Sequence, residues 1–352
     1  MTFIAFKNRD ENLKIMVRAA NWIGDAISTT PVIRALKKNF PNAKVVLLAK
    51  AWVIPVYEYN PYINEIMVYD ANSRHKKGLG TLRLAKDLKE QKFDFAVLFQ
   101  NAFEAALIAF LARIKQRLGY NTDCRGFLLN KSIKLKSALK KGHIIDYYLG
   151  LLKGADLIND GKKLDLFICR SDIDYAEKFL KDQNFDLKHP VIGINPGATG
   201  GKAKRWFPKR YAKLCERLGE KLKNKILIFG GAKDKELGEY ILKQFSNNCI
   251  NIAGTTTLGQ SFALIQKCSL FITNDSGLMH AAAALNINQI VIIGPTNHIA
   301  TAPLNKNSVI VRVPLDCSPC LKDSCKKGHH KCMQAIDVEM VFKECALFLK
   351  KE

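Results

Sequence analysis

Residues 270–286 read LFITNDSGLMHAAAALN: an apolar run of strand length, a polar turn at Ser276-Gly277, and a helical segment rich in small residues. The same order of apolar run, turn and helical-period segment recurs along almost the whole sequence. Repeated βα units of this kind form parallel sheets that are covered by helices. The predicted fold class is therefore α/β, with doubly wound domains.

Two series of such units can be recognised. In the first half, strands are predicted at Lys14–Arg18, Val45–Ala49, Glu65–Tyr69, Asp94–Phe99 and Arg117–Gly119, and helices at Ala26–Asn39, Leu79–Gln91 and Ala102–Arg113. In the second half, strands are predicted at Val191–Asn195, Ile226–Gly231, Cys249–Ala253, Leu270–Asp275 and Gln289–Gly294. Because ligands of doubly wound domains bind beyond the carboxyl ends of the strands, functional residues are expected in the loops that follow them.

A charged segment, Asp160–Pro190, separates the two series and carries one helical pattern, at Asp172–Lys181. It ends in His189-Pro190, where proline disfavours a continuing helix. The last segment, Asp337–Lys350, has apolar residues at the spacing of one helical side. The predicted division is an N-terminal Rossmann-like domain over 1–170, a linker over 171–190, a C-terminal Rossmann-like domain over 191–335, and a closing helix over 336–352.

The composition indicates a globular protein with an unusual charge. The 352 residues include 55 Lys+Arg against 32 Asp+Glu, a formal net charge of +23. The length is sufficient for two domains, and no run approaches the about 18 uncharged apolar residues that a membrane-spanning helix needs. The N-terminus lacks a continuous apolar region followed by a cleavage site, so a cytoplasmic protein is expected.

The charge has two interpretations. It favours a polyanionic partner, which includes nucleic acid, an anionic membrane leaflet or a phosphorylated substrate, or it reflects a lysine-rich solvated surface. A basic nucleic-acid-binding protein is the alternative from a different functional class. However, the sequence has neither an aromatic-plus-basic RNA motif nor a zinc-finger spacing, and its positive charge is spread along the chain.

The loop after the first strand contains a carboxylate at a functional position. Asp25 stands in AANWIGDAISTTPVIRAL (19–36), next to Gly24 and at the start of a predicted helix. An aspartate here is either an ordinary helix N-cap or a base toward a substrate hydroxyl. Both interpretations are consistent with the motif.

The loop NPGATGGKAKRWFP (195–208) is glycine-rich but is not an ATPase P-loop, because Pro196 and Ala203 stand where glycine and Ser or Thr are required. Its Gly197, Lys202, Lys204 and Arg205 precede a predicted helix and suit a phosphate clamp, or else an exposed basic loop.

The turn after Leu270–Asp275 places Asp275, Ser276, Gly277 and His280 at the start of a helix, whose amides and dipole stabilise phosphate groups. The alternatives are that Asp275 is a helix cap and His280 an interior histidine. In the neighbouring loop, Glu236 begins another helix, where a carboxylate either holds ribose hydroxyls or favours the dipole.

Four of the ten cysteines are clustered in CSPCLKDSCKKGHHKCM: Cys317, Cys320, Cys325 and Cys332. Their spacing with His329 and His330 makes them zinc candidates. The short spacings leave little chain for an ordinary zinc ribbon, and a metal-free loop with reduced thiols is the preferred interpretation.

These motifs together resemble a known family. VRAANWIGDAISTTPVIRALKKNFPNAKVVLLAK, GINPGATGGKAKRWFPKRYAKL, ITNDSGLMHAAAALN and CSPCLKDSCKKGHHKCM occur in the order found in ADP-heptose:lipopolysaccharide heptosyltransferases of glycosyltransferase family 9, and they look closest to the type II branch. The sequence departs from the pattern in about its first 13 residues and in the lysine-rich stretch Ser73–Gly80.

The resemblance implies a GT-B architecture, in which two Rossmann-like domains face a central cleft, the first binding the acceptor and the second ADP-heptose, and the last helix returns toward the first domain. It implies inverting transfer of L-glycero-D-manno-heptose to the first heptose of the Kdo2-lipid A inner core, with a sibling enzyme that adds the first or another core heptose as the alternative. Asp25 would be the general base and Lys204 the diphosphate clamp. Asp275, Ser276, Gly277, His280, Lys202, Gly197 and, less securely, Glu236 would bind the donor.

The implied partners are ADP-heptose, the heptosylated Kdo2-lipid A acceptor and the anionic leaflet at the cytoplasmic face of the inner membrane, and no nucleic acid is expected. The chemistry requires no cofactor, because Lys204 and a helix N-terminus can stabilise the leaving diphosphate. Mg²⁺ is possible but not implied.

Overall fold

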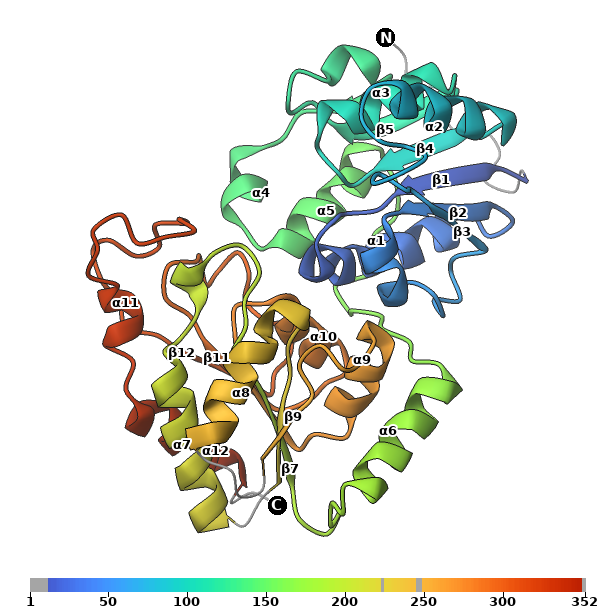
Figure 1. Cartoon of the computed structure of the whole chain (residues 1–352). Helices are drawn as coiled ribbons and strands as arrows, with labels where there is room; N and C mark the ends of the chain where they lie inside the picture. The colour runs from blue at the N-terminus through green and yellow to red at the C-terminus, as the bar shows by residue number, and fades with distance from the viewer. Residues whose placement is uncertain (1–11, 223–224, 245–248, 350–352) are drawn as a thin grey trace. The chain divides into compact units, whose positions relative to one another are not determined.

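The computed structural model describes residues 12–222, 225–244 and 249–349. Residues 1–11, which belong to the N-terminal departure noted above, and residues 350–352 of the expected closing helix lie outside this range. The chain divides into two compact units between Phe167 and Ile168 (Figure 1). No helix in the described ranges is long and apolar enough to cross a bilayer.

The first unit contains a parallel six-stranded sheet in the order β3-β2-β1-β4-β5-β6. Its strands are β1 (Lys14–Arg18), β2 (Lys44–Ala49), β3 (Glu65–Val68), β4 (Phe95–Leu98), β5 (Gln116–Tyr120) and β6 (Lys131–Ile133). Its helices are α1 (Ile23–Asn39), α2 (Leu79–Glu90), α3 (Phe103–Leu111), α4 (Ser137–Lys141) and α5 (Ile144–Gly154), with the 3₁₀ turns η1 (Ala51–Val56) and η2 (Gly126–Leu128).

The second unit repeats this design with the order β12-β11-β10-β7-β8-β9, also parallel. Its strands are β7 (Val191–Asn195), β8 (Lys225–Ile228), β9 (Cys249–Asn251), β10 (Leu270–Asn274), β11 (Gln289–Ile292) and β12 (Ser308–Val311). Its helices are α6 (Arg170–Asp182), α7 (Pro208–Leu222), α8 (Lys235–Gln244), α9 (Leu258–Gln266), α10 (Gly277–Ala284), α11 (Lys331–Gln334) and α12 (Val338–Leu349), with the 3₁₀ turns η3 (Lys202–Lys204) and η4 (Ala232–Asp234).

Alternation along the strands explains why helices cover both sides of the second sheet. On β8, Ile226 and Ile228 join the core formed with α7 and α12, whereas Leu227 joins the core formed with α6 and α9. Successive strand residues point to opposite faces, so a strand that is apolar at every position is buried on both. The predicted α/β class with doubly wound sheets is confirmed.

Both sheets have a switch point, which lies between two neighbouring strands from which the chain continues toward opposite sides of the sheet. In the first sheet it lies between β1 and β4, and in the second between β7 and β10. The carboxyl ends of parallel strands meet at one edge, and a switch point is where doubly wound sheets bind ligands. The loops after these four strands therefore lie where a ligand of each unit would bind.

Two segments of the expected domain division pack within the second unit. Residues 171–190 were expected to be a linker, yet α6 packs against α9 and places Ala176 and Leu180 in the second unit's core. The closing helix was expected to return toward the first domain. Within the second unit, α12 packs on α7 and the sheet, burying Val341, Phe342 and Cys345 there; its return toward the first domain stays a prediction. Apolar periodicity identified both helices but not the core that they cover.

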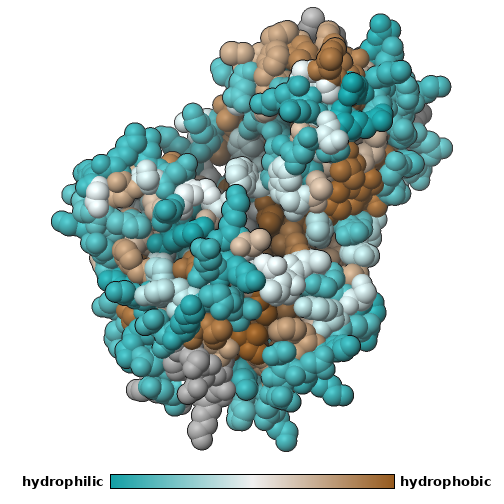
Figure 2. Space-filling view, viewed as in Figure 1, coloured by the Kyte–Doolittle hydropathy of each residue, from teal (hydrophilic) through white to brown (hydrophobic). Residues whose placement is uncertain are grey.

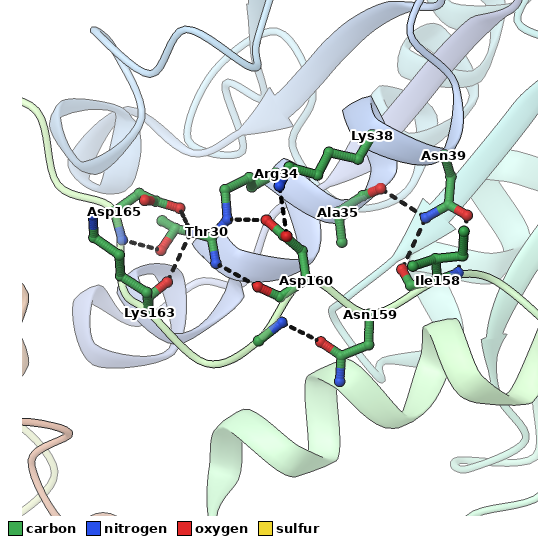
Figure 3. Close-up of polar contacts among 11 residues, drawn as sticks. Thr30, Arg34, Ala35, Lys38, Asn39, Ile158, Asn159, Asp160, Lys163 and Asp165 are labelled. Atoms are coloured by element: carbon green, nitrogen blue, oxygen red, sulfur yellow. Dashed lines mark hydrogen bonds and ion pairs between the residues drawn. The ribbon is translucent and has the colours of Figure 1, made fainter.

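In the first unit, a buried arginine fixes the chain that follows α5 (Figure 3). Arg34 of α1 donates from Nε to Asp160 at 2.7 Å and also forms an ion pair with Asp165. Thr30, one turn earlier, accepts a hydrogen bond from the backbone N–H of Asp165 at 3.0 Å. This extended chain is therefore held against the helix that carries Asp25.

Candidate functional site

In the first unit, Asp25 lies in the first turn of α1, just after the loop that leaves β1. Trp22 occupies the N-cap position, so the capping interpretation of Asp25 is wrong. Tyr148 of α5 donates a hydrogen bond from its hydroxyl to Oδ1 of Asp25 at 2.9 Å. Asp25 thus stands at the switch point of its sheet with one carboxylate oxygen oriented by a phenol.

The phenols near Asp25 are neutral donors. The pKa of Tyr148 is well above its usual value, because burial disfavours the phenolate and the charge of Asp25 adds to this effect. Tyr57 directly follows η1. Burial also raises its pKa, and its hydroxyl lies 2.8 Å from Oγ1 of Thr29. These two phenols therefore add no charge of their own near the Asp25 carboxylate.

Two buried arginines near the carboxyl ends of the same strands were missed by the sequence analysis. Arg18, the last residue of β1, donates to Oε1 of Gln100 at 2.7 Å, and Arg125 donates to Oδ1 of Asn101 at 2.8 Å. Burial lowers the pKa of each guanidinium to about 10, so both remain charged at neutral pH. The signal for Arg18 was available, since a charged residue directly follows the apolar run Ile15–Val17 at the carboxyl end of the strand.

In the second unit, the loops after β7 and β10 converge on an ion pair. Lys204 of η3 donates from Nζ to Oδ2 of Asp275 at 3.2 Å, across 71 positions of sequence. Asp275 is buried and Lys204 is partly buried. Asn195, at the end of β7, donates to Oγ of Ser276 at 2.8 Å. The sequence-predicted residues Lys204, Asp275 and Ser276 are therefore brought together at the switch point.

A single asparagine anchors the glycine-rich loop to β10. Asn274 donates to the carbonyl oxygen of Pro196 at 2.8 Å, and its Oδ1 accepts from the backbone N–H of Trp206 at 3.1 Å. Gly197 lies within this loop, where a Cβ would come 2.5 Å from a carboxylate oxygen of Asp234. The loop thus holds Lys204 in a fixed position, and Gly197 permits the close approach.

The start of α10 is capped by serine. Oγ of Ser276 accepts from the backbone N–H of Met279 at 3.4 Å, so Ser276 rather than Asp275 is the N-cap, and Gly277 is the first helical residue. His280 is buried in the same helix. Glu236 and Lys202 are exposed, the former in the first turn of α8 beyond β8 and the latter at the start of η3.

The cysteine-rich segment braces the loop that carries Lys204. The carbonyl of Asp323 accepts from the backbone N–H of Ala203 at 3.1 Å, and Nε2 of His330 lies 2.8 Å from the carbonyl oxygen of Ala203. A cavity of about 420 Å³ beside Ala203 is lined by Lys322, His329, His330 and the four clustered cysteines, among other residues.

The zinc interpretation of the four clustered cysteines stays a prediction. Among the residues that the model describes, no group of three or more His, Cys, Asp or Glu side chains is placed to hold a metal ion. Sγ of Cys325 accepts from the backbone N–H of His330 at 3.3 Å, and Cys332 is buried. Burial raises the pKa of the Cys332 thiol.

Comparison with known proteins adds to this geometry. A family model described as glycosyltransferase family 9 (heptosyltransferase) matches residues 81–331. The chain belongs to glycosyltransferase family 9. Among its relatives, lipopolysaccharide heptosyltransferase 2 of Salmonella typhimurium is 32% identical over 349 residues, covering 97% of this chain and 99% of that protein.

Two solved structures are similar over nearly the whole glycosyltransferase. ADP-heptose lipopolysaccharide heptosyltransferase II of Escherichia coli matches with a TM-score of 0.80 and 29% identity, covering 96% of this chain and 99% of the other. A family 9 glycosyltransferase of Veillonella parvula matches with a TM-score of 0.87 and 25% identity, covering 97% and 98%. The expected GT-B fold, with its two α/β domains, is confirmed by these likenesses.

Proposed function

We propose that this glycosyltransferase transfers L-glycero-D-manno-heptose from ADP-heptose to the first heptose of the Kdo2-lipid A inner core, with inversion at the anomeric carbon. The observation that carries the proposal is the distribution of similarity. Relatives named heptosyltransferase 2 align over 94–97% of this chain, whereas a relative named lipopolysaccharide heptosyltransferase 3 aligns over 81% at 27% identity. The likeness favours addition of the second heptose over a sibling reaction.

Asp25 is the proposed general base. A sugar hydroxyl is a poor nucleophile, and a carboxylate that accepts its proton during attack increases the rate by about 10²–10⁴-fold. The hydrogen bond from Tyr148 would orient the carboxylate, so Tyr148 is a positioning residue. Arg18 and Arg125 stay charged at the same end of the strands and hold the loop after β4 through Gln100 and Asn101.

The second unit is the proposed donor site. An ammonium group has three N–H donors, so the contact of Lys204 with Asp275 leaves donors for diphosphate oxygens. The N-terminus of α10 at Ser276 and Gly277 would add backbone donors and a favourable dipole as ADP leaves. Gly197, Lys202 and His280 would line the same site, and Glu236 would contact the ribose.

The proposed reaction needs no metal cofactor, because Lys204 and the α10 amides provide the stabilisation that a divalent cation would give. Transfer should therefore proceed at the same rate in the presence of EDTA. The proposal also places the protein at the cytoplasmic face of the inner membrane, where the lipid acceptor and an anionic leaflet would attract its net charge of +23.

One assay tests the reaction and the acceptor together. The protein is incubated with ADP-heptose and Kdo2-lipid A acceptors that carry no heptose, one heptose or two, and the products are identified by mass. The proposal expects one heptose to be added to the singly heptosylated acceptor. Transfer mainly to either of the other acceptors would establish a sibling heptosyltransferase instead. No transfer, together with tight and salt-dependent binding of duplex DNA or RNA, would favour the nucleic-acid-binding alternative.

A further inference from the structure

Helix α3 of the first unit has an apolar side that faces solvent. Its sequence is FEAALIAFL, and Ala105, Ala106, Ile108 and Ala109 supply its buried side. The opposite side of a surface helix is ordinarily polar. Here Phe103 and Phe110, which lie on one side of the helix, are 41% and 47% exposed, and Leu111 on the same side is partly exposed. Leu107 packs against the core of the unit.

The neighbouring turn η2 extends this apolar side. The ring of Phe127, which is 77% exposed, lies 6.2 Å from the ring of Phe103. We refer to Phe103, Phe110, Leu111 and Phe127 as the α3 surface. Figure 2 shows apolar atoms gathered over the α3 end of the first unit. Single exposed apolar residues are common, but a contiguous group that includes three phenylalanines indicates a docking surface.

The acidic residue of α3 is withdrawn from this surface. Glu104 accepts hydrogen bonds from the hydroxyls of Tyr69, at 3.2 Å, and Thr81, at 3.3 Å. Its charge is therefore satisfied between α3 and the elements packed beside it. Phe103, Phe110 and Leu111 present no anionic group of their own.

Cationic side chains accompany the apolar residues. The guanidinium of Arg117 lies 5.4 Å from the centre of the Phe110 ring. Arg113 and Lys115 directly follow α3 and are exposed, and Arg83 and Lys86 are exposed on α2, which packs beside α3. Of these, Lys115 is paired with Asp94 at 3.1 Å. Apolar side chains with long cationic neighbours are typical of proteins that lie in a membrane interface.

We propose that the α3 surface inserts into the headgroup region of an anionic lipid bilayer. The phenylalanine rings would enter the boundary between headgroups and acyl chains, while Arg83, Lys86 and Arg113 would contact lipid phosphates. A bilayer suits this surface better than a second copy of the chain, because two molecules that each carry a charge of +23 repel one another. The inference deepens the proposed function by assigning a surface to its membrane contact.

Vesicle binding tests the assignment. The full chain is sedimented with vesicles of phosphatidylethanolamine and phosphatidylglycerol, and separately with vesicles of phosphatidylcholine alone. We expect the variant Phe103→Ser/Phe110→Ser/Phe127→Ser to bind anionic vesicles about tenfold more weakly than the unsubstituted chain. The matched control Ile158→Ser/Leu187→Ser/Leu347→Ser removes three other exposed apolar side chains and should bind as the unsubstituted chain does. Equal binding by the triple phenylalanine variant would overturn the proposal.

A second measurement does not depend on the stability of that variant. In Phe127→Trp, the tryptophan should be quenched by brominated lipid in anionic vesicles beyond the quenching of the unsubstituted chain. Absence of additional quenching would overturn the proposal. So would a dimer of the unsubstituted chain that the serine substitutions dissociate without changing vesicle binding, because the surface would then hold a second copy.

The membrane role of the α3 surface and the proposed transfer reaction can be tested independently. Transfer to a deacylated, water-soluble acceptor reports the reaction alone, and the triple phenylalanine variant should perform it at the unsubstituted rate. A chain that binds vesicles through α3 but transfers no heptose would refute the proposed function and leave the surface assignment intact.

Discussion

Each unit places an aspartate just beyond a strand at the switch point of its sheet, and the two carboxylates have different partners. Asp25 accepts a hydrogen bond from a phenol, Tyr148, whereas Asp275 is paired with the ammonium of Lys204. The carboxylate of the ion pair positions a cation that can bind an anion, while the carboxylate that the phenol orients is placed to act as a base. The same topological position is thus suited to base catalysis in one unit and to anion binding in the other.

The largest expected effect comes from removing the proposed base. Asp25→Asn keeps the size of the side chain but cannot accept the acceptor's proton, so kcat should fall by about 10²–10⁴-fold. The measurement is the initial rate of heptose transfer at saturating donor. Near-normal turnover in this variant would remove Asp25 from the chemistry and end the contrast between the two aspartates.

The second-largest effect is expected when the ammonium group of Lys204 is removed. Lys204→Ala removes a hydrogen-bonding charge worth about 1.5–3 kcal/mol, so kcat/KM for ADP-heptose should fall by about 10–150-fold. Lys202→Ala is the matched control, because Lys202 is exposed in the same 3₁₀ turn, and its effect should be smaller. Unchanged kinetics of Lys204→Ala would mean that the Lys204–Asp275 pair is structural.

A smaller effect is expected when the hydroxyl of Tyr148 is removed. A hydrogen bond donated to a carboxylate favours its charged form, so Tyr148→Phe should make the base easier to protonate. The acid limb of kcat/KM should then move to higher pH, with little loss at the alkaline end of the profile. Tyr57 and Tyr147 also lie close enough for the charge of Asp25 to raise their pKa values.

Tyr57→Phe is the matched control for this profile, since the Tyr57 hydroxyl contacts Thr29. Its acid limb should stay in place. Identical profiles for the Tyr148 and Tyr57 variants would show that the hydroxyl of Tyr148 does not tune Asp25.

The smallest expected effect is at Glu236. The side chain is exposed, so a hydrogen bond to ribose competes with water, and Glu236→Gln should change KM for ADP-heptose by no more than about threefold. Steady-state kinetics would detect the change. A larger loss would place Glu236 among the principal donor contacts and alter the division of roles within the second unit.

The sequence predicted the central strands because each has a short run of consecutive apolar residues. β1 and β7 begin and end where expected, at Lys14–Arg18 and Val191–Asn195. The unpredicted strands, β6 and β12, lie at sheet edges; β6 is buried at none of its positions and β12 at one. Edge strands are short and have weak apolar patterns, so tertiary pairing rather than local sequence defines them.

The site was predictable only in part, for a physical reason. Loops after parallel strands converge at the carboxyl ends of the strands, and this rule predicts that Lys204 and Asp275 lie at the same end of the second sheet. The contact of Tyr148 with Asp25 spans 123 positions and depends on how α5 packs against α1. The apolar periodicity of a helix does not predict such a contact. Nor does it predict which core α12 covers.

Titration of ADP-heptose into the isolated variants, without acceptor, tests the central contrast most directly. If the first aspartate serves the chemistry and the second unit holds the donor, Asp25→Asn should bind ADP-heptose within about twofold of the unsubstituted chain, and Lys204→Ala should bind it at least about tenfold more weakly. Loss of donor binding in Asp25→Asn, with binding retained in Lys204→Ala, would contradict the account.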